Sequence, residues 1–195
     1  MKIFIDLGAY TGDTLRIALE VYKHFDRFYA FEPFSASFEV LKETFVGREE
    51  IILYNAAADV TTGQKKLYLQ SAHDLCPNAG HSLLSGKSNV REDTFEIVAS
   101  VDFSTFVTST FSMSDTIVLK IDIEGMEYDL LAKMIDDESI RYINKIFCEW
   151  HATRANIGKR RHKEIIKRLR KCGLDVSGVN RRDEFVRVMK SPDGS

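Results

Sequence analysis

Carboxylate and imidazole side chains follow two apolar segments in the second half of the sequence. Asp122 and Glu124 come at the end of TIVLKIDIEG, and Glu149 and His151 come at the end of NKIFCEWH. Histidine is the side chain best suited to accept a proton near neutral pH, and clustered carboxylates hold a cation. We therefore predict that Asp122, Glu124 and His151 are catalytic residues, with His151 as the base.

Two alternatives to His151 as the base stay open. His73 and His81 lie in a segment rich in Ser, Asn and Gly, and each offers an imidazole. Asp122, Glu124 and a nearby His or Glu could instead bind Mg²⁺ or Mn²⁺, which would activate a hydroxyl. Acids at a strand end also stabilise the N-terminus of the next helix, so the cluster has an explanation without a metal. We expect a site without a metal ion.

The segment KIFIDLGAYTGDT, residues 2–14, predicts a strand, a glycine turn and the start of a helix. This arrangement brings backbone N–H groups and a helix N-terminus close to a ligand. Asp6, Gly8, Tyr10 and Thr11 are the candidate cofactor-binding residues of this turn. Dinucleotide binding is typical of GxGxxG, whereas GAYTG has its second glycine four positions after the first. The spacing disfavours NAD.

The elements that must position these residues alternate along the chain. Apolar segments at 3–7, 27–32, 50–59, 116–123 and 144–150 predict strands, and helical patterns follow at 16–25, 35–45, 126–135 and 161–173, with Ser35 as a helix cap. Alternating strands and helices indicate a Rossmann-like α/β fold, with a mostly parallel sheet and helices on both faces. Residues 174–180 and 184–190 resemble a C-terminal antiparallel hairpin.

One region interrupts this alternation. Residues 61–100 predict a hairpin with Gly63 at its turn, followed by a long polar segment. Long loops inside a domain are often functional, so we expect residues 71–93 to be a mobile lid over the acceptor, that is, over the substrate that receives a group in the reaction. A length of 195 residues suits one domain, and we take residues 1–195 as a single unit.

Acidic residues lie where the predicted strands end, which is where open parallel sheets bind ligands. An acidic rim repels a pyrophosphate and attracts a cation. Glu32, after the second strand, is placed to accept hydrogen bonds from ribose hydroxyls. Ala57 and Ala58 leave room for an adenine ring, and Asp59 can accept from its amine. A nucleoside without phosphates and with a positive charge fits S-adenosylmethionine, and Asp122 is a candidate to contact it as well.

Lys120 lies inside the apolar segment TIVLKIDI, where alternation places it on the same side as Asp122. An unpaired buried ammonium is very costly, so this lysine needs a carboxylate partner. Asp6 or Glu149 on a neighbouring strand could provide it. We predict that Lys120 forms a structural ion pair rather than acting in catalysis.

Four motifs together carry a resemblance to a known family: FIDLGAYTGDT, FEP, NAAAD and VLKIDIEGMEYDLL. From residue 3 to residue 151 the chain resembles the FkbM family of class I S-adenosylmethionine-dependent methyltransferases, with KIDIEGME as the most specific element. The resemblance implies methyl transfer to oxygen, often on a sugar or polyketide hydroxyl. A small-molecule or glycan acceptor is therefore the expected partner, and the resemblance does not identify which one.

Composition excludes several classes of protein. The net charge of −2 argues against a surface built for nucleic acid, and no apolar run is long enough for a membrane span. The basic run GKRRHKEIIKRLRK reads as a solvated helix face, with a phosphate-bearing acceptor or RNA as the minor alternative. The three cysteines show no CxxC spacing, which suits a reducing compartment, and we expect a cytoplasmic protein.

Two other functions remain as alternatives to an O-methyltransferase. An NAD-dependent oxidoreductase shares the fold class but would favour the missing GxGxxG. A non-catalytic cofactor-binding subunit would keep the pocket, although the polar rim argues against it.

Overall fold

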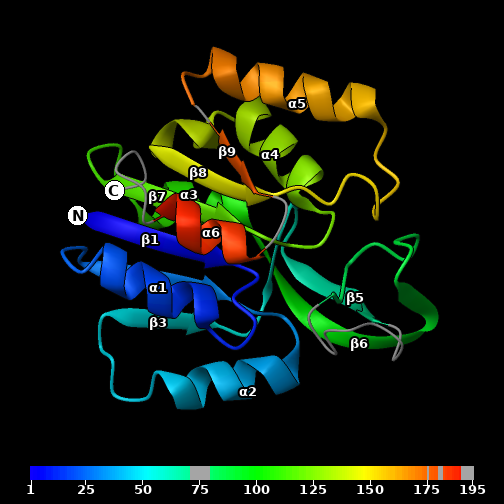
Figure 1. Cartoon of the computed structure of the whole chain (residues 1–195), viewed down its shortest axis with the longest axis horizontal. Coiled ribbons are helices and arrows are strands. Elements are labelled where there is room, and N and C mark those ends of the chain that lie inside the picture. The colour runs from blue at the N-terminus through cyan, green and yellow to red at the C-terminus, as the bar shows by residue number, and fades with distance from the viewer. Residues whose placement is uncertain (71–79, 175, 180–181, 190–195) are drawn as a thin grey trace.

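The main sheet of the computed structural model has six parallel strands in the order β3-β2-β1-β7-β8-β9 (Figure 1). The structure describes residues 1–70, 80–174, 176–179 and 182–189. The strands are β1 (Lys2–Leu7), β2 (Arg27–Phe31), β3 (Ile51–Tyr54), β7 (Thr116–Ile121), β8 (Lys145–Glu149) and β9 (Val176–Val179). From β1 the chain moves first toward β3 and later toward β9, so the strand order reverses between β1 and β7. The carboxyl ends of these two strands mark the expected ligand site of such a sheet.

Helices cover both faces of the main sheet, as predicted. The helices α1 (Asp13–Val21), α2 (Ser35–Thr44) and α6 (Arg182–Met189) pack on one face, and α3 (Phe103–Thr110), α4 (Glu127–Asp136), α5 (Lys159–Lys171) and the short 3₁₀ helix η1 (Ser139–Tyr142) pack on the other. Side chains of β1 alternate between the two cores: Ile3 and Ile5 lie on the α4 side, and Phe4 lies on the α1 side. This alternation confirms a Rossmann-like α/β fold.

A smaller sheet lies beyond the carboxyl ends of the main strands, at the right of Figure 1. It contains β4 (Ala57–Asp59), β5 (Gly63–Gln70) and β6 (Val90–Asp102) in the order β4-β6-β5. The predicted strand over 50–59 is therefore two strands, which separate at Asn55, whose side chain donates to the backbone oxygens of Glu32 and Pro33. The predicted hairpin at Gly63 is wrong, because β4 and β5 do not pair with each other and β6 lies between them.

The predicted C-terminal antiparallel hairpin is also wrong. β9 pairs parallel to β8, and the segment after it forms α6. Phe185 and Met189 lie four residues apart and are both buried in the core on the α1 side. That spacing is helical, and it outweighed the short alternation that indicated a strand.

Two helix starts also differ from the sequence prediction. Ser35 does not cap α2, because the preceding Phe34 occupies the cap position and no side chain caps this helix. α3 was not predicted at all, and Asp102 caps it by accepting a hydrogen bond from the Thr105 backbone N–H. Among the described residues, no helix combines the length and the apolar character needed to cross a membrane.

Candidate active site

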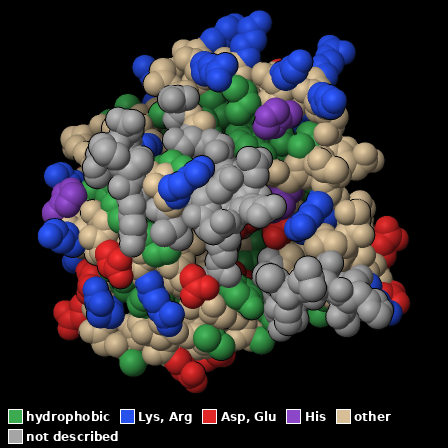
Figure 2. Space-filling view, in the orientation of Figure 1, with side chains coloured by type: hydrophobic (Ala, Val, Ile, Leu, Met, Phe, Trp, Pro, Cys, Tyr) green, Lys and Arg blue, Asp and Glu red, His purple; other side chains and the backbone are tan. Residues whose placement is uncertain are grey.

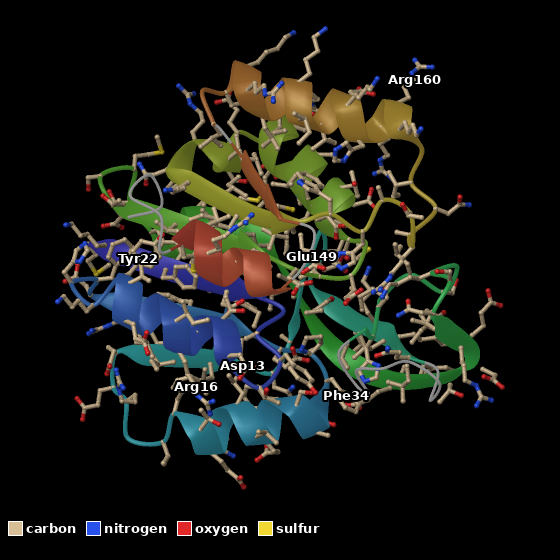
Figure 3. The ribbon with its side chains drawn as sticks, in the orientation of Figure 1. Asp13, Arg16, Tyr22, Phe34, Glu149 and Arg160 are labelled. Carbon is tan, nitrogen blue, oxygen red and sulfur yellow. The ribbon has the colours of Figure 1, made fainter. Side chains whose placement is uncertain are left out.

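One pocket opens at the carboxyl ends of the main strands, between the main sheet and the smaller sheet. Glu32, Pro33, Ala57 and Ala58 line it near β2 and β4, and Asp122, Glu124 and Glu149 line it near β7 and β8. Strands lie about 4.8 Å apart, and three such steps separate β2 from β8, so these two ends are roughly 14 Å apart. Figure 3 shows Glu149 near the centre of the molecule, between the two sheets.

The turn after β1 uses its own backbone N–H groups inside the protein. Gly8 and Ala9 each donate to the Phe31 carbonyl at 3.0 Å, and Tyr10 donates to the Glu32 carboxylate at 2.8 Å. Gly8 has a φ of 77°, and a Cβ there would lie 1.8 Å from the Asp122 carbonyl oxygen. Only glycine therefore allows this close contact with Asp122, directly after β7. Because the N–H groups of Gly8, Ala9 and Tyr10 already donate within the protein, they are not available to a phosphate.

Glu32 is buried, and it still lines the pocket. Its two carboxylate oxygens accept hydrogen bonds from the backbone N–H groups of Tyr10 and Phe34 at 2.8 and 2.9 Å. Burial raises the pKa of Glu32 to about 7, although these two hydrogen bonds favour the charged form. Each carboxylate oxygen has a second lone pair, so Glu32 can also accept from a ligand hydroxyl.

The predicted ion pair of Lys120 is confirmed. Its ammonium lies 2.8 Å from the Asp6 carboxylate and 3.6 Å from that of Asp122, and it also donates to the Gly8 carbonyl at 2.7 Å. Lys120 and Asp6 are both almost completely buried. Asp6 is not among the residues that line the pocket, and it reaches the turn through its pair with Lys120, so its role in cofactor binding stays a prediction.

Four carboxylates surround His151. Its Nε2 atom lies 3.3 Å from Glu124, 3.6 Å from Glu149 and 3.8 Å from Asp122, and its Nδ1 atom lies 3.4 Å from Glu127. Glu127 is completely buried, and it also accepts the backbone N–H groups of Gly125 and His151. Glu127 therefore holds the His151 backbone and lies beside one ring nitrogen, while three acids face the other ring nitrogen.

These charges decide which groups are ionised. Burial alone lowers the pKa of His151, but the facing carboxylates of Glu127 and Glu124 outweigh it and raise this pKa to about 9. Burial and the charge of Asp122 raise the pKa of Glu149 to about 7. Burial likewise raises the pKa of Glu124. At neutral pH His151 is an imidazolium, which has no lone pair to accept a proton, whereas Glu149 titrates in the range that a base needs.

The loop before β6 is attached to the site through Glu124. The Ser82 hydroxyl donates to the Glu124 backbone carbonyl at 2.7 Å, and the buried Lys87 ammonium pairs with the Glu124 carboxylate. Glu124 has a φ of 55°, which is a strained value for a residue other than glycine. Residues 71–79 of the predicted lid, including His73, lie outside the described part of the chain. The described part, from residue 80 onward, packs against the rim.

The remaining predicted cofactor residues lie at different depths. Ala57 and Ala58 line the pocket, as does Tyr10. Asp59 is buried, and its carboxylate accepts from the Val60 backbone and lies 3.1 Å from the Lys65 ammonium, away from the residues that line the pocket. Thr11 does not line the pocket either. Their roles in cofactor binding stay predictions.

The basic run on α5 lies apart from the pocket. Figure 2 shows Lys and Arg side chains gathered over this helix at the top of the view, and Figure 3 places Arg160 at its outer end. Ile165 and Leu169 are buried beneath the helix, and Arg161 and Arg168 pair with Asp129 and Asp136 of α4. This geometry agrees with a solvated helix face.

Within the described part of the chain, one group of three residues could hold a metal ion. Asp122, Glu149 and His151 each offer a ligand atom, and these atoms lie within 4.8 Å of one another. A metal would need the neutral form of His151, but the surrounding carboxylates favour the protonated ring. The expectation of a site without a metal ion stays a prediction.

Three residues of this site were not predicted from the sequence as functional. Glu149 was named among the acids at the strand ends and as a possible partner for Lys120, but it was not predicted as a catalytic residue. Glu127 reads as an ordinary acid in the first turn of a helix. Lys87 has no sequence signal, since its burial depends on how the loop folds against Glu124.

Comparisons with known proteins identify the family of the chain. A family model described as the methyltransferase FkbM domain matches residues 6–176. No curated protein matches the chain. Among solved structures, the crystal structure of methyltransferase FkbM from Methylobacillus flagellatus KT is similar at 17% identity with a TM-score of 0.44, and the match covers 72% of this chain and 31% of that one.

The family match includes the turn after β1, Glu32, β4, and the acids that follow β7 and β8. Of these, the residues that line the pocket are Gly8, Tyr10, Glu32, Ala57, Ala58, Asp122, Glu124 and Glu149. The chain spans about a third of the length of that solved structure, and it belongs to the FkbM methyltransferase domain family.

Proposed function

We propose that this chain transfers a methyl group from S-adenosylmethionine to a hydroxyl of a sugar, glycan or related small metabolite. The observation that carries the proposal is a single pocket with Glu32 at one end and the carboxylates of Asp122, Glu124 and Glu149 at the other. Among the described residues that line it, Lys120 is the one Lys or Arg, and Asp6 pairs with it. A ligand with ribose at one end and positive charge at the other matches this distribution, whereas a pyrophosphate does not.

The residues present fit S-adenosylmethionine in three places. Glu32 would accept the ribose hydroxyls, and Ala57 and Ala58 leave space for the base beside it. Asp122, which is partly exposed in the pocket, would hold the ammonium group of the methionine part. When bound, S-adenosylmethionine supplies a methyl group that its sulfonium has already activated.

The chain itself must orient the acceptor and remove its proton. Holding two reactants in line can supply about 7–11 kcal/mol of the barrier reduction. In the transfer, the acceptor oxygen would form a bond to the methyl carbon while the carbon–sulfur bond breaks, which would leave S-adenosylhomocysteine, and the hydroxyl proton would pass to a side chain of the pocket. Glu149 is the proposed proton acceptor, because it lines the pocket and its pKa is about 7. His151 stays charged beside it, and Glu127 fixes the ring.

Calorimetry with S-adenosylmethionine, S-adenosylhomocysteine and NAD tests the cofactor. We expect the first two to bind and NAD not to bind. Glu32→Gln should weaken the binding of S-adenosylmethionine and of S-adenosylhomocysteine by about tenfold or more, since charge-assisted hydrogen bonds are lost. Glu39→Gln is the matched control, because Glu39 lies exposed on α2. Binding of NAD, or full affinity in Glu32→Gln, contradicts the proposal.

A product search tests the reaction. The protein is incubated with S-adenosylmethionine and a library of sugars, nucleotide-linked sugars and glycans, and mass spectrometry detects a gain of one CH₂. Chemical cleavage of the product then distinguishes an ether from a methylated nitrogen. A product methylated on nitrogen or carbon would refute the O-methyltransferase assignment.

A further inference from the structure

His81 presents a second imidazole at the pocket, distant in sequence from the acidic cluster. It lies between β5 and β6 and lines the pocket beside residues of the Glu32 end. Its ring packs edge-on against the Phe34 ring, with centroids 4.3 Å apart and an interplanar angle of 67°. Phe34 in turn donates its backbone N–H to Glu32. His81 therefore belongs to the nucleoside end of the pocket.

The protonation of His81 follows from its contact with β5. Its Nδ1 atom accepts a hydrogen bond from the Gln70 backbone N–H at 2.8 Å, so Nδ1 carries a lone pair and no proton. Burial, with a smaller contribution from the charge of Lys87, lowers the pKa of His81 to about 4. The ring is neutral, and its single proton lies on Nε2.

This Nε2–H group has no hydrogen-bond partner among the described residues, although it is buried. A buried donor without an acceptor is costly, and such groups usually meet a ligand or water. The same assignment removes His81 from the candidate bases, because its lone pair is already used by Gln70. His81 can donate to a ligand but not accept a proton from it.

We propose that the Nε2–H group of His81 donates a hydrogen bond to a ring nitrogen of the adenine base. This inference rests on the proposed function. Pro33, Ala57 and Leu67 line the same pocket, and their apolar side chains suit a flat ring. Adenine offers ring nitrogens as acceptors, whereas its amine donates, so a donor in the wall selects a ring nitrogen. His81 is thus a specificity residue for the base and not a catalytic residue.

The experiment compares S-adenosylhomocysteine with its 1-deaza, 3-deaza and 7-deaza adenine analogues by calorimetry. Each analogue replaces one ring nitrogen with C–H and so removes one acceptor. For the wild type, we expect one analogue to bind about fivefold to tenfold more weakly than S-adenosylhomocysteine. In His81→Phe, which keeps a ring against Phe34, that difference should disappear. His24→Phe is the matched control, since His24 is exposed, and it should keep the wild-type pattern.

Four outcomes are distinguishable. A loss of discrimination confined to His81→Phe supports the inference. Equal affinity of the wild type for all four ligands overturns it, and this result does not require any variant to fold. Discrimination that persists in His81→Phe overturns it as well, because another group would then contact the nitrogen. A wild type that does not bind S-adenosylhomocysteine overturns the proposed function together with this inference.

Discussion

Two charged clusters lie at the carboxyl ends of neighbouring strands, and they differ in their balance of charge. In the first, the Lys120 ammonium faces Asp6 at 2.8 Å and also contacts two backbone carbonyls, so a buried cation is matched by a buried anion. In the second, four carboxylates lie around the single imidazole of His151, with Lys87 compensating one of them.

We call the Lys120 cluster matched and the His151 cluster unmatched, and we expect the first to stabilise the fold and the second to take part in the reaction. The pair of Lys120 and Asp6 leaves no net charge in the interior, and Lys120 also holds the turn by donating to the Gly8 carbonyl. Burial, with a contribution from the neighbouring acids, raises the pKa of Glu124 and raises that of Glu149 to about 7. The same acids keep a proton on His151. Asp122 contacts both clusters, since it lies near Lys120 and near His151. The matched cluster should therefore govern stability, and the unmatched cluster should govern turnover.

The largest expected effect is on stability, from Lys120→Met. This change leaves Asp6 buried without its cation, which typically costs about 3–5 kcal/mol. Urea unfolding at pH 7 measures the change in the free energy of unfolding. Lys133→Met is the matched control, because its pairs with Asp102 and Asp137 are partly exposed, and it should cost less than about 1 kcal/mol. Equal losses in the two variants would show that the Lys120 pair is not structural.

The next effect is on turnover, from Glu149→Gln. Gln has nearly the same shape as Glu but cannot take the hydroxyl proton, so the methylation rate should fall by roughly a hundredfold or more. The affinity for S-adenosylhomocysteine should stay within about threefold of wild type, since Glu32 and Asp122 are unchanged. The rate is measured with an acceptor identified by the product search. Full activity of Glu149→Gln would contradict its role as the base.

Part of this contrast could be predicted from the sequence alone. Lys120 in an apolar strand required a carboxylate, and Asp6 on the neighbouring strand provided it. Glu32 directly follows an apolar strand and lines the pocket, whereas its contact with ribose stays a prediction. His151 was predicted as the base from its residue type, but its charge depends on four acids from three segments, and no local pattern shows that they converge. The fold was predictable because strand patterns alternate with helix patterns along the chain. The segment that forms α6 was misread as a strand, because a short run of alternating apolar and polar residues also fits one face of a helix.

Glu32 differs from both clusters, because it is a buried acid with no Lys or Arg among its hydrogen-bond partners in the described structure. Its pKa of about 7 lies above the ordinary value of a carboxyl group, so Glu32 becomes protonated as the pH falls below 7. Only the ionised form accepts from both ribose hydroxyls. The affinity for S-adenosylhomocysteine should therefore fall about tenfold between pH 8 and pH 6.

Calorimetry across this range measures the change, with two variants for comparison. Glu32→Gln should bind weakly and without this pH dependence. Glu149→Gln should keep the dependence, which separates the two groups that titrate near pH 7. An affinity of the wild type that is constant from pH 6 to pH 8 would argue against ribose binding by Glu32.

The smallest expected effect comes from removing metal ions. A divalent cation at Asp122, Glu149 and His151 would balance the acids in place of the His151 proton. Because the protonated ring already supplies a positive charge, dialysis against EDTA should leave the methylation rate unchanged within error. If EDTA abolished activity and Mg²⁺ or Mn²⁺ restored it, a bound metal ion, and not the His151 proton, would balance the acids.

The most direct test of the unmatched cluster is the charge of His151 itself. Imidazole nitrogen chemical shifts distinguish the charged ring from the neutral one, and NMR spectra of ¹⁵N-histidine-labelled protein can follow them between pH 6 and pH 10. His151→Gln identifies the resonance by its absence. We expect a charged ring at pH 7 that loses its proton with a pKa of about 9. A ring that is neutral at pH 7 would contradict the assignment and restore His151 as the base.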